Sequence, residues 1–97
     1  MGLDELRMRL DGIDNQMLDL LSKRAQVILQ VADFKQQHRL PAHVPDRETA
    51  IFERLRTTNP GPLSADAIER IYRTVIEEMR RFEEQYVTTG RSSRINR

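Results

Sequence analysis

Apolar residues at seven-residue intervals occupy the first third of the chain, and this pattern restricts the possible folds more than any other feature. The residues involved form two interleaved series: Leu3, Leu10, Met17, Arg24 and Val31, and Leu6, Ile13, Leu20, Val27 and Phe34. All of them except Arg24 are apolar, which predicts one long helix with a seam that supercoils around a partner helix. At about 1.5 Å per residue such a helix is about 50 Å long. A chain of 97 residues cannot cover that length by itself.

The composition fits an all-α domain that is helical throughout. Charged residues make up 32% of the chain and aromatic residues only 5%, which is typical of helical bundles and coiled coils. The formal net charge of +1 favours neither nucleic acid nor a membrane surface as a partner. The chain contains no cysteine, and His38 and His43 lack the spacing of metal ligands, so we expect both to lie on a loop surface. The first residues do not look like a leader or a membrane span, and we expect a cytoplasmic protein.

Helical periodicity continues in two further segments. The predicted helices have the bounds Asp4 to Gln37 or His38, Asp46 to Thr57, and Ala65 to Thr88. Pro45 suits the first turn of the second helix, and Ser64 is a good N-cap for the third. We therefore expect a long, a short and a long helix in an intertwined homodimeric bundle, with one domain over residues 1–90. Residues 91–97 are basic and polar, and are expected to be a disordered tail or a linker.

Several charged residues lie on or beside the apolar faces of the predicted helices. Arg24 occupies the seam, and Lys35 follows eleven residues later on nearly the same helix face, about 20° away. With Arg47 at the start of the second helix, they predict a cationic pocket for an anion with more than one carboxylate. Arg7 is about 25 Å from Arg24 along the helix, so it can reach such a pocket only across an antiparallel dimer seam. Glu83 lies at the edge of the apolar stripe of the third helix.

Each of these residues also has a structural explanation. Arg7 and Glu83 can be ordinary surface residues, and Lys35 can extend its stem over apolar surface to reach water. Arg24 can pair with a carboxylate across the seam and set the register of the two helices.

The pattern resembles the all-helical (type II) class of chorismate mutase. In the first helix the resemblance lies in Leu6-Arg7-x-x-Leu10-x-x-Ile13-Asp14-x-x-x-Leu18-x-Leu20-Leu21-x-x-Arg24. It continues in Lys35, in Asp46-Arg47-Glu48, and in Ile71-Tyr72-x-x-Val75-Ile76-Glu77. It covers about Leu3 to Tyr86, and implies a domain-swapped dimer of three-helix chains.

The resemblance also implies an activity, the Claisen rearrangement of chorismate to prephenate in phenylalanine and tyrosine biosynthesis. This reaction uses no metal, cofactor or nucleophile. By resemblance Arg24, with Arg7 from the partner chain, binds the substrate carboxylates, and Lys35 contacts the ether oxygen. Glu48 binds the ring hydroxyl with Arg47 in support.

Three residues depart from patterns found in the family. Val44 aligns with an aspartate of some members, and Met79 with a small polar residue. Glu83 aligns with a glutamine that donates to the ether oxygen in many members. A glutamic acid can donate there only when it is protonated, so we expect activity to fall as pH rises.

Two other kinds of function remain open from the sequence. The same scaffold can act on a related substrate, as 4-amino-4-deoxychorismate mutase or isochorismate pyruvate-lyase, and Val44 keeps the amino analogue in consideration. A non-catalytic helical dimerisation or regulatory module is the alternative of a different class. A fusion to, or partnership with, another enzyme of the aromatic pathway is also compatible with the chain.

Overall fold

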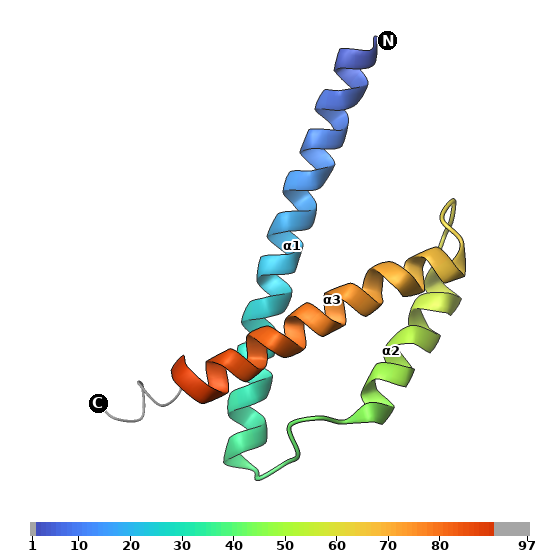
Figure 1. The fold of residues 1–97 in the computed structure, drawn as a ribbon. Helices are drawn as coiled ribbons and strands as arrows, with labels where there is room; N and C mark the ends of the chain where they lie inside the picture. The colour runs from blue at the N-terminus through green and yellow to red at the C-terminus, as the bar shows by residue number, and fades with distance from the viewer. Residues whose placement is uncertain (1, 91–97) are drawn as a thin grey trace.

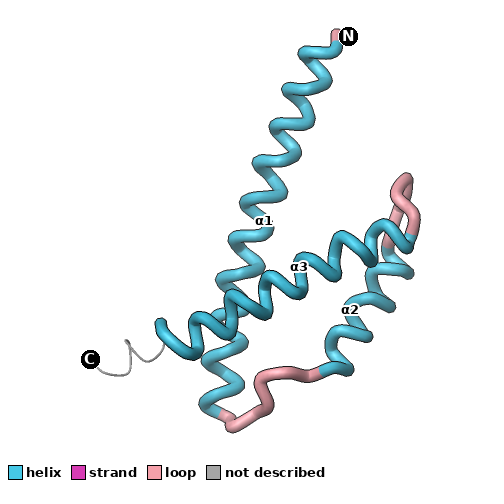
Figure 2. Tube along the Cα trace, in the orientation of Figure 1, coloured by secondary structure: helices cyan, strands magenta, loops and turns pink. Residues whose placement is uncertain are grey.

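The computed structural model describes residues 2–90, and these form a chain of helices without a strand (Figures 1 and 2). Helix α1 spans Leu3–Gln37, α2 spans Pro45–Thr58 and α3 spans Ala65–Gln85. A π-helical turn, η1, follows at Tyr86–Gly90. The predicted all-α class and the order of long, short and long helices are confirmed. The predicted tail lies outside the described residues.

Local signals explain most of the helix ends. Pro45 is the first residue of α2, and the Ser64 hydroxyl accepts a hydrogen bond from the Ala67 backbone N–H at 3.1 Å as the N-cap of α3. Helix α1 begins one residue before the predicted start, after Gly2 and without a side-chain cap. Helix α3 ends three residues earlier than predicted because its last residues widen into η1.

Helix α3 crosses the lower part of α1 and packs along α2 (Figure 1). Each helix contributes one buried apolar residue to the small core: Ala32, Ile51 and Ile76. An ion-pair cluster holds the loop end of the α2–α3 hairpin, where the Arg56 guanidinium donates to Glu69 at 3.0 Å and to Asp66 at 3.5 Å. Hydrogen bonds from Arg56, and then from Arg73, lower the pKa of the Glu69 carboxyl.

The N-terminal half of α1 extends away from the other helices (Figure 1). Every residue from 2 to 23 is exposed, including nine large apolar residues: Leu3, Leu6, Met8, Leu10, Ile13, Met17, Leu18, Leu20 and Leu21. The radius of gyration is 17.1 Å, against about 13 Å for a compact domain of this length. Most of the heptad seam is therefore uncovered within one chain. No helix of the described part has the length and apolar character needed to cross a membrane.

The C-terminal half of α1 is covered on one side only. Ala32 is buried against the other helices, whereas Val27 and Phe34 of the seam remain 53% and 54% exposed. Within a single chain the other sides of this half stay uncovered, because α3 crosses it on one face and α2 packs along α3 rather than against α1 (Figure 2).

Candidate active site

A cavity of about 460 Å³ lies between the C-terminal half of α1, the loop that follows it, the start of α2 and the end of α3. Seven of the eight residues predicted for the site line this cavity: Arg24, Lys35, Val44, Arg47, Glu48, Met79 and Glu83. The helices thus bring together residues that lie between positions 24 and 83 of the chain. The eighth predicted residue, Arg7, is not among the lining residues.

Lys35 is held at the centre of this arrangement by the loop and by α3. Its Nζ donates to the Ala42 carbonyl oxygen at 2.8 Å and lies 3.5 Å from Glu83 Oε2. The two side chains are 21% and 15% exposed, so the pair is largely shielded from water. An ammonium and a carboxyl group this close can both contact one atom of a bound ligand.

The end of α1 explains how the loop reaches Lys35. The Leu40 N–H donates to the Lys35 carbonyl oxygen at 2.8 Å, and the Arg39 N–H donates to Gln36 at 3.2 Å. These are the two hydrogen bonds of a Schellman motif, which reverses the chain after a helix. Arg39 takes the left-handed position of the motif with φ +54°, where glycine is the usual residue. The reversal places the backbone of Ala42 against the Lys35 side chain.

Glu48 is the second carboxyl group of the cavity and has two partners that the sequence did not indicate. Its Oε2 lies 2.9 Å from His43 Nε2 in the loop. The Arg80 guanidinium of α3 donates to Oε2 at 3.2 Å and to Oε1 at 3.4 Å. His43 was expected on the loop surface, and although it is more than half exposed, it lines the cavity. Arg80 is one residue after Met79 and was not distinguished from the other arginines of α3.

The charges of the lining residues favour an anionic ligand. Four are cationic, namely Arg24, Lys35, Arg47 and Arg80, and two are carboxyl groups, Glu48 and Glu83. With His43 neutral, four positive and two negative charges leave the cavity with a net charge of +2. Apolar side chains complete its walls, including Val27, Val31 and Ile76, and they reduce the competition of water for these charges. The arrangement can bind a small dianion and hold it against an apolar surface.

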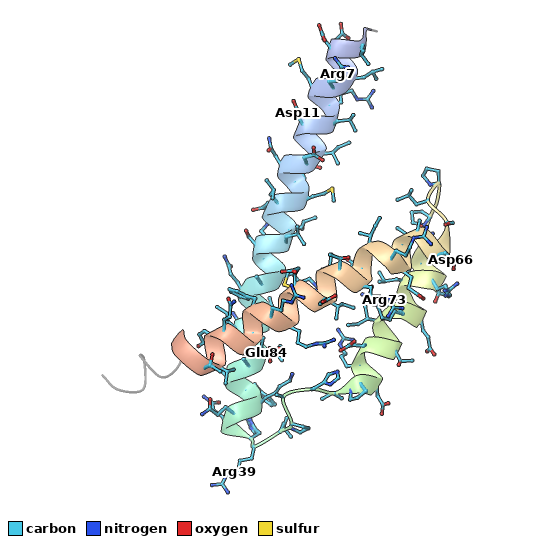
Figure 3. The ribbon with its side chains drawn as sticks, in the orientation of Figure 1. Arg7, Asp11, Arg39, Asp66, Arg73 and Glu84 are labelled. Carbon is cyan, nitrogen blue, oxygen red and sulfur yellow. The ribbon has the colours of Figure 1, made fainter. Side chains whose placement is uncertain are left out.

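Arg7 lies near the free end of α1, far from this cavity (Figure 3). Arg24 follows seventeen positions later in the same helix, at a distance of about 25 Å along its axis. An arginine side chain cannot span that distance, so Arg7 does not complete the cavity of its own chain.

Comparison with known proteins relates this architecture to one enzyme family. The family model "Chorismate mutase type II" matches residues 6–84. The bifunctional chorismate mutase/prephenate dehydratase of Aquifex aeolicus is 38% identical over 78 residues, covering 76% of this chain and 22% of that protein. A chorismate mutase of Methanocaldococcus jannaschii is 30% identical over 86 residues, covering 88% of this chain and 87% of that protein.

A solved structure shares the fold as well. The crystal structure of chorismate mutase from Helicobacter pylori in complex with prephenate has a TM-score of 0.82 and 32% identity, and covers 90% of this chain and 94% of its own. This chain spans only about a fifth of the length of the bifunctional relatives. The helix order, the cationic cavity and the match over residues 6–84 place the chain in the type II chorismate mutase family.

Proposed function

We propose that this chain catalyses the rearrangement of chorismate to prephenate, as a homodimer with two active sites shared between the chains. The observation that carries the proposal is the pair formed by Lys35 Nζ and Glu83 Oε2, 3.5 Å apart in a cavity with a net positive charge. Chorismate has two carboxylates and an ether C–O bond that breaks in the reaction. A cationic cavity binds the carboxylates, and two adjacent polar groups can converge on the ether oxygen.

The proposed roles follow from the charge that each group can stabilise. Arg24 binds a carboxylate, and Lys35 donates to the ether oxygen, where negative charge develops in the transition state. When it carries a proton, Glu83 donates to the same oxygen from α3. Glu48 accepts a hydrogen bond from the ring hydroxyl, and Arg47 supports this end of the site. The apolar walls, with Val44 and Met79, hold the substrate in the reactive conformation, which removes much of the entropic barrier.

The dimer is proposed because one chain leaves both its seam and its site incomplete. Six seam residues between Leu3 and Leu20 are exposed in the single chain, and burial of each large apolar side chain contributes about 1.5–3 kcal/mol. A second copy of α1 in antiparallel orientation covers them. The same pairing moves Arg7 of the partner subunit toward Arg24 and Lys35, where it supplies the second carboxylate-binding arginine.

A further enzyme of the aromatic pathway is proposed as a fused or associated partner. The support is the bifunctional Aquifex aeolicus relative, whose name joins chorismate mutase to prephenate dehydratase. The match with the present chain covers 22% of the length of the Aquifex aeolicus protein.

A direct assay tests the activity. Purified protein is expected to consume chorismate and to form prephenate in equal amounts without an added metal or cofactor. Lys35→Ala should lower kcat by about 10²- to 10³-fold, the usual loss when a donor to developing negative charge is removed, with an unchanged helical spectrum.

Lys23→Ala is the matched control, because Lys23 pairs with Asp19 on the exposed surface of α1. It should retain nearly full turnover. Formation of pyruvate from isochorismate in place of prephenate, or full turnover by Lys35→Ala, would contradict the proposal.

A further inference from the structure

The Glu48 carboxylate enters the cavity with most of its hydrogen-bonding capacity already used. A carboxylate offers about four lone pairs, two on each oxygen. Oε2 has two partners, His43 Nε2 at 2.9 Å and Arg80 Nη2 at 3.2 Å. Oε1 has one, Arg80 Nη2 at 3.4 Å. One acceptor position on Oε1 therefore remains for a ligand.

The charge around Glu48 is also already balanced. Arg80 neutralises the carboxylate, and Arg47 lines the same cavity one residue before Glu48. Lys35 and Glu83 form another ion pair in the cavity, so the Glu83 carboxyl group already has a cationic partner. The loop residue Val44 is apolar and therefore brings no further negative charge to the cavity. A ligand group that approaches Glu48 meets one free lone pair and an adjacent guanidinium.

A hydroxyl group and an ammonium group respond differently to this environment. The hydroxyl donates one hydrogen bond, is uncharged, and can accept from a nearby N–H. The ammonium has three donors, accepts nothing, and is repelled by the Arg80 guanidinium in a partly desolvated cavity. The ammonium also has to compete with Arg80 for the carboxylate.

We propose that Arg80 is a specificity-determining residue that selects a ring hydroxyl over a ring ammonium at the substrate carbon next to Glu48. This inference rests on the proposed function, since it assigns the orientation of chorismate with its ring hydroxyl toward Glu48. The predicted selectivity distinguishes chorismate, which has the hydroxyl group at this carbon, from 4-amino-4-deoxychorismate, which has an amino group there. Val44 alone leaves both substrates possible, and Arg80 supplies the discrimination.

The test compares kcat/KM for chorismate and for 4-amino-4-deoxychorismate in the wild type, Arg80→Met and Arg80→Lys. Methionine keeps an apolar stem without the charge, whereas lysine keeps the charge. The ratio of amino to hydroxyl substrate should rise at least tenfold in Arg80→Met and stay near the wild-type value in Arg80→Lys. Arg80→Gln, a polar neutral variant, should behave as Arg80→Met and gives the same readout if methionine disturbs packing.

Arg81→Met is the matched control, because Arg81 is the next arginine of α3 and pairs with Glu77 and Glu78 on the surface. It should leave the ratio unchanged. When the pH is raised until the substrate amine loses its proton, the ratio of kcat/KM for the amino substrate to that for chorismate should rise. The rise should be larger in the wild type than in Arg80→Met, because only the wild type has the guanidinium that repels the protonated amine. A purely structural role of Arg80 does not produce this difference.

The two proposals fail in different ways. If the wild type converts neither substrate, the proposed function is wrong. If the wild type converts chorismate but Arg80→Met leaves the ratio unchanged, only the role of Arg80 is wrong. A wild type that prefers the amino substrate also overturns the role of Arg80.

Discussion

The two halves of α1 carry the same heptad pattern in different surroundings. In the N-terminal half, Leu10 is 58% exposed and every residue from 2 to 23 is exposed. In the C-terminal half, Ala32 is 3% exposed, and Arg24 and Lys35 line a cavity closed by α2 and α3. A heptad pattern therefore marks a surface that requires a partner, and that partner need not belong to the same chain.

The exposed half also differs from an ordinary protein surface. Its apolar residues are contiguous along one helix, and a patch of this kind on a monomer indicates an interaction site. The covered half supplies most of the chemistry, and the exposed half supplies Arg7 and the apolar contacts that we assign to the dimer. Substitutions in the two halves should consequently fail in different ways.

The largest effect is expected from a charge in the exposed seam. Leu10→Glu should prevent dimer formation and lower kcat/KM by at least about 100-fold, because a buried unpaired carboxylate costs several kcal/mol and the loss of the partner removes Arg7 from the site. Sedimentation velocity and the prephenate assay measure the two effects on one preparation.

Met8→Glu is the control for that substitution. Met8 is even more exposed than Leu10, at 71%, but lies outside the two heptad series. It should leave the dimer and the activity nearly unchanged. If both variants behave alike, exposure within one chain explains the result and the seam has no special role.

A smaller effect, on the pH profile, is expected in the covered half. Protonated Glu83 can donate to the ether oxygen, and the carboxylate cannot, so wild-type kcat should fall up to tenfold per pH unit once this group has lost its proton. Glu83→Gln donates at every pH and should give a flat profile. A wild-type profile that is flat from acid to mildly basic pH, or that does not change in Glu83→Gln, contradicts this role.

The smallest effect is expected where the covered half ends. Arg39 has a positive φ, a conformation that costs a residue with a Cβ atom about 1–2 kcal/mol of free energy. Glycine has no Cβ atom and avoids part of this cost. Arg39→Gly should stabilise the fold by about 0.5–1 kcal/mol, measured as a higher urea midpoint with an unchanged slope. A lower midpoint would mean that the Arg39 side chain contributes more than its backbone strain costs.

The sequence predicts the elements of this fold well because each has a local cause. Proline at the start of α2 and Ser64 before α3 fix those ends with groups that are adjacent in the chain. The end of α1 is different, since the left-handed turn is made by an arginine, and no glycine signals it.

The site was predicted in part for the same reason. Arg24 stands out because it interrupts an apolar pattern on one helix, and Lys35 stands out because it follows on nearly the same face of that helix. The contacts of Glu48 with His43 and Arg80 were missed because they join a loop, α2 and α3. They depend on the path of the loop and on the rotation of α3, which residue spacing does not determine.

The most direct measurement for the shared site is complementation between two inactive chains. Arg7→Ala and Lys35→Ala are each expected to be nearly inactive, and they are unfolded together and refolded as an equal mixture. Random pairing makes half of the dimers mixed, and each mixed dimer has one site with both residues intact, so about a quarter of the wild-type activity should return. If the mixture stays as inactive as the separate variants while mixed dimers form, Arg7 and Lys35 do not act in a site shared between two chains.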